Sequence, residues 1–126
     1  NGVERALILL PDELSGAWGE YGVKIEGAGS YSDGEANTRA MAEAGSEIAV
    51  KALELGGFIP SCLEGQLLMA AKADGLVELR DDRYHWLSTQ RSAYYAYGMA
   101  FEDGWLNYYG KDSERLARPV RSLPIQ

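Results

Sequence analysis

The sequence predicts an α+β fold, in which two helices pack on a small antiparallel sheet, because helical and strand patterns occupy separate parts of the chain. Residues 35–55 and 62–73 carry apolar residues at helical spacing. Residues 84–123 contain most of the aromatic residues, in short runs that turn residues separate. We therefore expect the chain to end in an antiparallel meander rich in tyrosine and tryptophan.

At 126 residues the chain is long enough to bury a core without metal or disulfide support, so we expect one domain over residues 1–126. Residues 1–55 should form an acidic half made of a strand, a loop and a helix, and residues 56–126 a helix followed by the meander. The single cysteine, Cys62, excludes an internal disulfide and a zinc site built from several cysteines, which fits a reducing compartment. Since no segment has the pattern of a leader or the length of a membrane span, we expect a soluble, cytoplasmic protein.

Nineteen acidic and twelve basic residues give a net charge of −7, which argues against direct binding to nucleic acid or anionic lipid. Residues 1–54 hold ten acidic and four basic residues, whereas residues 55–126 hold nine and eight. The acidic half is therefore either a solvated surface or a face complementary to a basic, DNA-binding surface of a partner.

Three elements are expected before the first helix. Residues 6–10 form a short apolar run that a proline ends, which is typical of a buried strand. Residues 12–22 contain three glycines and no sustained period, so we expect a loop with Trp18 or Tyr21 packed inside. Residues 23–26 are a candidate for a brief second strand.

The longest helix is expected over residues 35–55, where apolar residues recur three or four positions apart. These are Met41, Ala44, Ile48, Ala52 and Leu55. Asp33 or Ser32 can cap its start, and the glycines at positions 56 and 57 its end. Gly45 disfavours a helix interior by about 1 kcal/mol relative to alanine, so a kink or break would fall there.

A second helix is expected over residues 62–73, because Ser61 and Glu64 form a capping box at its start. Its apolar face would consist of Leu63, Leu67, Leu68 and Ala71. Residues 76–79 are either a short strand or a turn. The strands expected in the meander are residues 84–89, 94–101, 105–109 and 116–123.

Asp103 and Gly104 separate two of these strands, and this dipeptide is typical of a two-residue type I′ turn, in which both central residues need positive φ. Alternation would place Tyr95 and Tyr97 on one face of the sheet and Tyr94 on the other. Exposed tyrosine and tryptophan anchor protein interfaces, so we expect at least two rings of the meander in a binding patch. The basic residues expected to pair with acids inside the fold are Arg115, Arg118 and Arg121.

The meander also resembles a domain of unknown function that occurs in phage and bacterial surface proteins, including the C-terminal region of a collagen-like Legionella adhesin. The resemblance rests on residues 86–89, 92–97, 101–104 and 118–121, and upstream on residues 56–61 and 64–68. It covers about residues 56–123 and implies a variant of the C-type-lectin-like fold. That fold is shared with formylglycine-generating enzymes and phage tropism determinants.

No residue pattern predicts catalysis or a cofactor. His85 is the only histidine and lies in a predicted strand, and Cys62 has no evident base partner. The related formylglycine-generating enzymes use a cysteine pair, which a single cysteine cannot supply. Lectins that bind sugar through calcium use residue triplets that are missing here, and the nearest segment, residues 105–107, lacks the second carboxylate. We therefore expect a binding protein without enzymatic activity and without a metal.

Two kinds of binding protein remain. In size, acidity and single-domain form the chain resembles the anti-CRISPR proteins, some of which act as DNA mimics. The second kind is the receptor- or glycan-binding tip of a phage tail fibre or adhesin, which is usually trimeric and joined to a long stalk. Because the first predicted strand begins near residue 3, we expect no stalk before it. We therefore favour a monomeric, phage-encoded inhibitor that blocks a basic DNA-binding surface of a host CRISPR-Cas complex.

The predicted partner contacts combine acids of the N-terminal half, acting as phosphate surrogates, with aromatic residues of the meander. They are Asp12, Glu13, Glu20, Asp33, Glu35, Glu43, Glu47, Tyr95, Tyr97, Trp105 and Tyr108.

Overall fold

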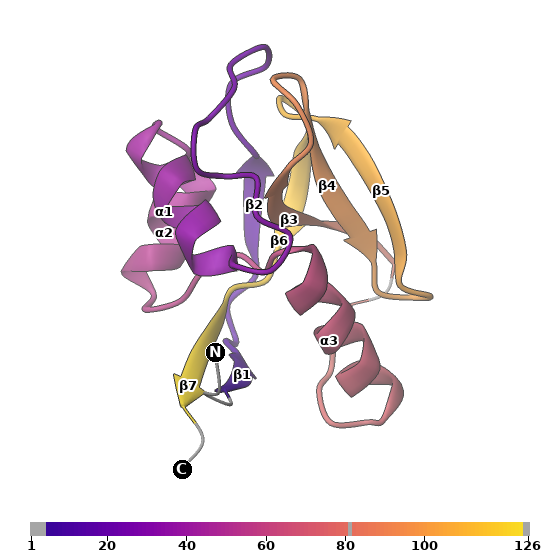
Figure 1. Ribbon diagram of the computed structural model, residues 1–126. Helices are drawn as coiled ribbons and strands as arrows, with labels where there is room; N and C mark the ends of the chain where they lie inside the picture. The colour runs from indigo at the N-terminus through magenta and orange to yellow at the C-terminus, as the bar shows by residue number, and fades with distance from the viewer. Residues whose placement is uncertain (1–4, 81, 125–126) are drawn as a thin grey trace.

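The chain adopts an α+β fold, which the computed structural model describes over residues 5–80 and 82–124. The helices of this part of the chain are α1 (Gly34–Glu43), α2 (Glu47–Glu54) and α3 (Cys62–Ala73). Its strands are β1 (Arg5–Leu9), β2 (Leu14–Ala17), β3 (Tyr84–Gln90), β4 (Tyr95–Ala100), β5 (Trp105–Gly110), β6 (Glu114–Ala117) and β7 (Val120–Pro124). Figure 1 shows α1 and α2 beside one flank of the larger sheet and α3 below it.

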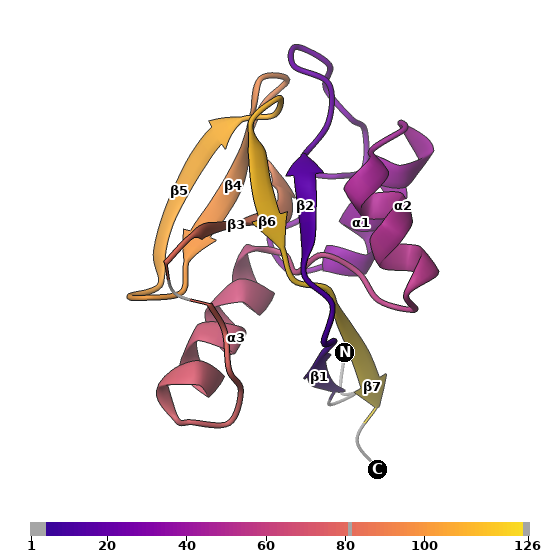
Figure 2. The same cartoon turned by 180° about the vertical axis from the view of Figure 1, so that it is seen from behind.

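The strands form a five-stranded sheet, in the order β2-β6-β3-β4-β5, and a separate two-stranded sheet of β1 and β7. Strands β3, β4 and β5 are antiparallel neighbours, as the predicted meander requires. Strand β6 then crosses to the other side of β3 and runs parallel to it, with His85 opposite Leu116. Figure 2 shows β6 between β2 and β3 and β5 at the outer edge of the sheet. The larger sheet is therefore mixed rather than antiparallel.

The long helix predicted over residues 35–55 is broken at Gly45, where the sequence indicates a kink or break. The described residues therefore contain three helices rather than the two predicted. Gly45 has φ of +93° and separates α1 from α2. Such a left-handed conformation suits glycine and ends a helix. The break brings Ser46 inward, where its Oγ donates a hydrogen bond of 2.8 Å to Trp18 O. Asp33 caps α1 by accepting a hydrogen bond from Ala36 N, as the sequence predicts.

The segment before α1 also differs from the prediction. Strand β2 forms where a loop was expected, and residues 23–26 are not a strand. Strand β2 pairs with β6, a distant segment, so no local pattern announces it. Trp18 is buried, and its Nε1 donates to Leu87 O at 2.9 Å, whereas Tyr21 lies at the surface. The predicted strand near residues 6–10 exists as β1, and its expected start near residue 3 lies outside the described residues.

The C-terminal run of residues 116–123 divides between the two sheets. Arg118 and Pro119 separate β6 from β7, and proline has no N–H to continue a ladder. The next residue, Val120, exchanges backbone hydrogen bonds of 2.9 and 2.7 Å with Phe58 and so enters new pairing. The prediction of a single strand over residues 116–123 is therefore wrong.

The connection between β4 and β5 is longer than predicted. Ala100 pairs with Trp105, which leaves residues 101–104 as a four-residue loop. Gly104 has φ of +77°, but no described residue other than glycine has positive φ, so Asp103 does not form a type I′ turn. Asp103 instead accepts a hydrogen bond of 3.0 Å from Trp105 N through its carboxylate.

Helix α3 agrees with the prediction over its whole length. Ser61 Oγ accepts from Glu64 N at 3.3 Å, and the Glu64 carboxylate accepts from Ser61 N at 2.9 Å, which completes the capping box. Of the three leucines on its predicted apolar face, however, only Leu68 is buried, and Leu63 and Leu67 are exposed. Residues 76–79 form no strand.

The core consists of two clusters of buried side chains. The cluster under α1 and α2 contains Trp86 and Ala96, and the cluster under α3 contains Leu87 and Met99. Since neighbouring residues of a strand point to opposite faces, the two clusters lie on opposite faces of the larger sheet. Both faces of β3 are therefore packed, which agrees with the burial of nearly every residue in that strand.

Lys111 is fully buried beneath the loop that precedes α1. Its Nζ donates hydrogen bonds to Val23 O at 2.7 Å and to Gln90 Oε1 at 2.6 Å, and it lies 4.8 Å from the centre of the Trp18 ring. Burial disfavours the charged amine and lowers the pKa of Lys111 to about 8. The loop is thus attached to the sheet through a charged side chain rather than through strand pairing.

This burial predicts a pH-dependent stability. The pKa of Lys111 is about 8 in the folded protein and an ordinary 10.5 in the unfolded chain, so the unfolded state binds more protons between these values. The free energy of unfolding should rise with pH across this window. This rise of the free energy of unfolding should disappear in Lys111→Met. It should persist in the control Lys51→Met, in which the replaced lysine is exposed. Urea unfolding at several pH values measures the effect, and identical pH profiles for the native protein and Lys111→Met would contradict it.

Candidate functional site

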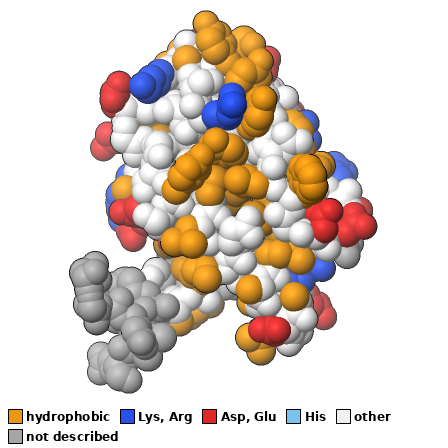
Figure 3. Space-filling view, turned by 45° about the vertical axis from the view of Figure 1, so that its right-hand side comes forward, with side chains coloured by type: hydrophobic (Ala, Val, Ile, Leu, Met, Phe, Trp, Pro, Cys, Tyr) orange, Lys and Arg blue, Asp and Glu red, His pale blue; other side chains and the backbone are white. Residues whose placement is uncertain are grey.

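The most distinctive surface of the protein is a set of neighbouring tyrosine rings, which we call the tyrosine surface. It comprises Tyr21, Tyr31, Tyr94, Tyr95, Tyr97 and Tyr108. Figure 3 shows hydrophobic side chains gathered in a band over the side of the molecule that carries β4, β5 and α3, with acidic side chains mainly near the margins of the view. Aromatic rings that remain exposed in this number are typical of a binding surface.

The register of β4 and β5 places the centre of this surface. Tyr97 lies opposite Tyr108, so their side chains share one face of the sheet, and Tyr95 joins that face two residues away. The ring centres of Tyr95 and Tyr108 are 5.4 Å apart. Tyr94 precedes β4, so strand alternation does not govern it. Its ring lies 6.4 Å from that of Tyr95, and the predicted separation of the two onto opposite faces is wrong.

Two loop residues extend the surface beyond the strands. The Tyr21 ring lies 5.2 Å from that of Tyr94, and the Tyr31 hydroxyl donates a hydrogen bond of 2.7 Å to the Tyr97 hydroxyl. Tyr21 and Tyr31 are 48% and 54% exposed, respectively, and Tyr94 is 49% exposed. Sequence reasoning missed both loop residues as contacts, because neither lies in a periodic segment and only the folded loop brings them to the strands.

The backbone of the loop explains why these rings are held in place. Gly22 N donates to Ala93 O at 3.0 Å, which fixes the loop beside the start of β4. Leu63 N, at the first turn of α3, donates to Tyr31 O at 2.8 Å. Together with the Nζ of Lys111 on Val23 O, these contacts join the loop to both the sheet and α3.

The electrostatic character of the tyrosine surface differs from that of the chain as a whole. The Arg91 guanidinium lies over the Tyr108 ring, 4.0 Å from its centre, in a cation–π contact. Donation to the Tyr97 hydroxyl, together with burial, raises the pKa of Tyr31 to about 12. The neighbouring Tyr95 hydroxyl likewise raises the pKa of Tyr21. Tyr21 and Tyr31 therefore remain neutral hydrogen-bonding groups at ordinary pH.

Trp105 does not belong to this surface. It is 62% exposed, but alternation along β5 places it on the face opposite to Tyr108. Tyr109 shares that second face, where its ring packs against Trp86 and beneath the Arg115 guanidinium. Of the aromatic residues predicted to contact a partner, Tyr95, Tyr97 and Tyr108 therefore lie together and Trp105 lies apart.

Three of the acids predicted to contact a partner make contacts within the protein. Asp33 caps α1, Glu35 forms an ion pair of 2.8 Å with Arg39, and Glu13 lies 3.2 Å from Arg80. The acids Asp12, Glu20, Glu43 and Glu47 are exposed. Two of these, Glu20 and Glu47, line a cavity of about 490 Å³ between β2 and α2, together with Glu114 and Lys51.

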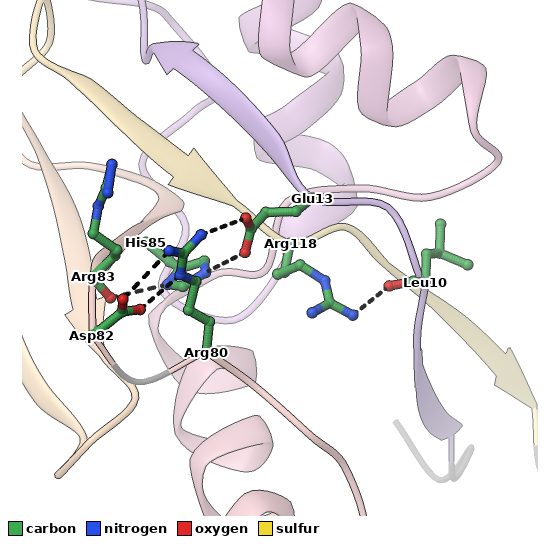
Figure 4. Close-up of polar contacts among 7 residues, drawn as sticks. All are labelled: Leu10, Glu13, Arg80, Asp82, Arg83, His85 and Arg118. Atoms are coloured by element: carbon green, nitrogen blue, oxygen red, sulfur yellow. Dashed lines mark hydrogen bonds and ion pairs between the residues drawn. The ribbon is translucent and has the colours of Figure 1, made fainter.

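A polar cluster of Glu13, Arg80, Asp82 and His85 lies where the two sheets meet, and Figure 4 shows these four side chains gathered around the Arg80 guanidinium. Arg80 binds Glu13 and also Asp82, whose carboxylate accepts from Arg80 Nε at 2.7 Å. His85 is 1% exposed, and its Nε2 lies 3.6 Å from the Glu13 carboxylate. Burial lowers the pKa of His85, although Glu13 partly opposes this. A histidine so buried has no surface from which to reach a substrate, and we assign the cluster to stability.

The predicted pairing of the C-terminal arginines with acids is wrong for two of them. Arg118 donates to Leu10 O at 2.7 Å, which joins the β6–β7 connection to the end of β1 (Figure 4). Arg115 stacks on Tyr109, with its guanidinium 3.6 Å from the ring centre. Arg118 therefore stabilises the fold through a backbone carbonyl, and Arg115 through an aromatic ring.

The other residues considered for chemistry are Cys62 and possible metal ligands. Cys62 is buried at the start of α3, and burial raises the pKa of its thiol, which keeps it protonated. Within residues 5–80 and 82–124, no group of three His, Cys, Asp or Glu side chains is arranged to hold a metal ion. Nor does any helix in this part of the chain have the length and apolar character needed to cross a membrane.

The fold and this surface define an α+β protein that displays tyrosine rings on one side of a mixed sheet. No protein family model matches the chain, and no curated protein or solved structure was found to be similar to it. The assignment of a role therefore depends on the geometry of the surface itself.

The hydrogen bond between two tyrosines of the surface can be tested directly. Because donation to Tyr97 is the main cause of the raised pKa of Tyr31, Tyr97→Phe should lower that pKa from about 12 toward its ordinary 10.0. Tyr109, whose pKa burial and Tyr84 raise to about 12, should be unaffected and is the internal control. NMR titration of ring-labelled tyrosine resolves the two groups. An unchanged Tyr31 pKa in the variant would show that the hydroxyl contact does not form in solution.

Proposed function

We propose that the protein is a receptor-binding domain of the kind found at the tips of phage tail fibres and adhesins, and that it binds through the tyrosine surface. The observation that supports this is a set of six partly exposed rings in two contacting groups, one of Tyr21, Tyr94, Tyr95 and Tyr108 and one of Tyr31 and Tyr97, which the pairing of Tyr97 with Tyr108 places next to each other. Tyrosine provides a large contact area and a hydroxyl for hydrogen bonding at a small entropic penalty, which suits it to recognition.

The finer assignment to a C-type-lectin-like fold is part of this proposal. Its support is the resemblance of residues 56–123 to a domain of phage and bacterial surface proteins. Three helices with two sheets in the described residues are consistent with such a domain. The calcium-dependent sugar-binding triplets are missing from the sequence, so recognition would depend on rings and hydroxyl groups rather than on an ion.

A cell-binding experiment tests the proposal. The fluorescently labelled protein should bind at least one strain in a panel of intact bacteria, measured by flow cytometry. The double variant Tyr21→Ser/Tyr94→Ser should weaken that binding at least about tenfold, because exposed aromatic anchors dominate interface energy. Both positions are exposed, so the fold should persist. The variant Leu76→Ser, at an exposed leucine in the loop after α3, is the matched control and should bind normally. Equal binding by the double variant, or no binding to any strain, would reject the proposal.

The second candidate function is the phage-encoded inhibitor of a CRISPR-Cas complex, acting inside the host cell. Its support is the net charge of −7 and the cavity between β2 and α2, where Glu20, Glu47 and Glu114 are all exposed. These carboxylates would take the place of DNA phosphates on a basic surface, and binding would weaken with added salt. The acids bound within the fold, Glu13 and Glu35, contribute less because arginines already neutralise them.

Phage plating on bacteria that carry an active CRISPR-Cas system distinguishes the two functions. If the chain is an inhibitor, its expression should restore plaques, and the triple variant Glu20→Lys/Glu47→Lys/Glu114→Lys should lose this effect because the charge of the cavity is reversed. The variant Tyr21→Ser/Tyr94→Ser should still restore plaques. Inhibition that survives the charge reversal, or that fails for the native chain, would count against the inhibitor.

A further inference from the structure

The outer edge of β5 is a second feature from which binding can be inferred. Strand β5 is the last strand of the five-stranded sheet and has β4 as its one neighbour in the described sheet order. Its six residues pair with β4 without a bulge, from Trp105 opposite Ala100 to Gly110 opposite Tyr95. The strand contains no proline and no charged residue. Proteins usually protect an edge strand with such residues or with a bulge, because an unpaired edge invites another strand.

The register shows which backbone groups face outward. Lys111 N donates to Tyr94 O, so these two residues form a hydrogen-bonded pair just beyond β5. Hydrogen-bonded pairs alternate along an antiparallel ladder, so Tyr109 and Asn107 also point their backbone groups toward β4. The N–H and C=O groups of Leu106 and Tyr108 therefore point away from the sheet.

One of these outward groups is already engaged in a replaceable contact. Tyr108 N donates a hydrogen bond of 2.8 Å to Oδ1 of Asn107, the preceding side chain. This contact occupies the position where the carbonyl of an added strand would accept. An incoming strand can displace the Asn107 amide without breaking any bond of the β4–β5 ladder.

The side chains along the edge would contact both faces of an added strand. Leu106 and Tyr108 are 38% and 42% exposed on the face of the tyrosine surface, and Trp105 is exposed on the opposite face. An added strand would therefore find apolar contacts for alternate side chains on either face.

The charges at the two ends of β5 indicate what kind of strand fits. Glu102 and Asp103 are exposed just before β5, and Asp112 is exposed just after it. A second copy of the chain is disfavoured, because an antiparallel pairing of Leu106 with Tyr108 of the other copy would bring Glu102 opposite its Asp112. The net charge of −7 on each copy adds to this repulsion. A strand with basic residues at its ends and apolar residues in its centre would instead be complementary.

We propose that the edge of β5 binds an extended peptide segment of a partner protein, apolar in its centre and basic at its ends, which adds to the sheet as a sixth strand. This proposal rests on the proposed receptor-binding function and identifies the receptor as a polypeptide. The outward N–H and C=O groups of Leu106 and Tyr108 form the hydrogen-bonded ladder with the peptide. The aromatic rings beside this edge select the side chains of the peptide.

The test uses a displayed library of random peptides of about ten residues, long enough to cover the edge strand. Peptides selected on the native protein should carry lysine or arginine near their ends. They should bind Leu106→Pro at least about tenfold more weakly, because proline removes an outward N–H that the β4–β5 ladder does not use. Binding to Asn107→Ala should be tighter, since the competing acceptor on Tyr108 N is gone. Side-chain contact alone would not produce that gain.

Leu106→Lys is a second variant that keeps the backbone N–H, and it addresses the case in which the proline variant fails to fold. A lysine in the middle of the edge places a charge against the apolar centre of the peptide and should weaken binding, whereas Leu76→Lys, at an exposed leucine outside the edge, should not. Equal binding to the native protein, Leu106→Pro and Leu106→Lys overturns the proposal, as does the absence of any selected peptide. A dimer in sedimentation that Leu106→Pro abolishes would assign the edge to a second copy and also overturn it.

The same peptides separate this proposal from the proposed function. If Tyr21→Ser/Tyr94→Ser loses peptide binding and the Leu106 variants do not, the tyrosine surface is the binding site and the edge proposal fails alone. If the edge variants lose peptide binding but Tyr21→Ser/Tyr94→Ser still binds cells as the native protein does, the edge proposal holds and the tyrosine surface is not the receptor site.

Discussion

The packing of this protein depends on the hydrogen bonds that the buried amine of Lys111 makes inside the fold. An unpartnered ammonium in the core is strongly unfavourable, so the contacts of its Nζ with Val23 O and Gln90 must persist. The loop of residues 19–33 contains no strand, and its backbone groups need partners from elsewhere. Gln90 supplies two of them by accepting from Ile25 N and donating to Ile25 O. The loop that carries two rings of the tyrosine surface is thereby held against the sheet.

The sequence predicts the elements whose signals are local. The Ser61 and Glu64 capping box and the Asp33 cap identify helix starts, because each cap involves residues three positions apart. Strands β3, β4 and β5 follow from their apolar and aromatic runs. Strand β2 and the division of the C-terminal run depend instead on pairing across the chain, and the parallel contact of β6 with β3 is equally distant. Local patterns cannot show whether such a segment forms a strand or a loop, or one strand or two. These outcomes have similar propensity and differ in tertiary contacts.

The same distinction applies to the candidate site. The sequence predicts Tyr95, Tyr97 and Tyr108 as partner contacts because exposed tyrosine anchors interfaces, and the register brings the three together. Tyr21 and Tyr31 come from a segment without periodicity, so only its side-chain anchors reveal that they belong to the surface. The acids show what composition alone does not reveal. Composition counts every carboxylate equally, although caps and ion pairs engage several of them within the fold.

The contacts among the rings of the tyrosine surface would favour the proposed binding. Each ring contacts at least one other ring, and Tyr31 is also held by a hydroxyl hydrogen bond. A surface already ordered in the free protein loses little side-chain entropy on binding, so more of the contact energy appears as affinity. The edge of β5 adjoins this surface through Tyr108, which contributes its ring to one and its backbone to the other. A partner strand on that edge would therefore place its side chains next to rings that need no rearrangement.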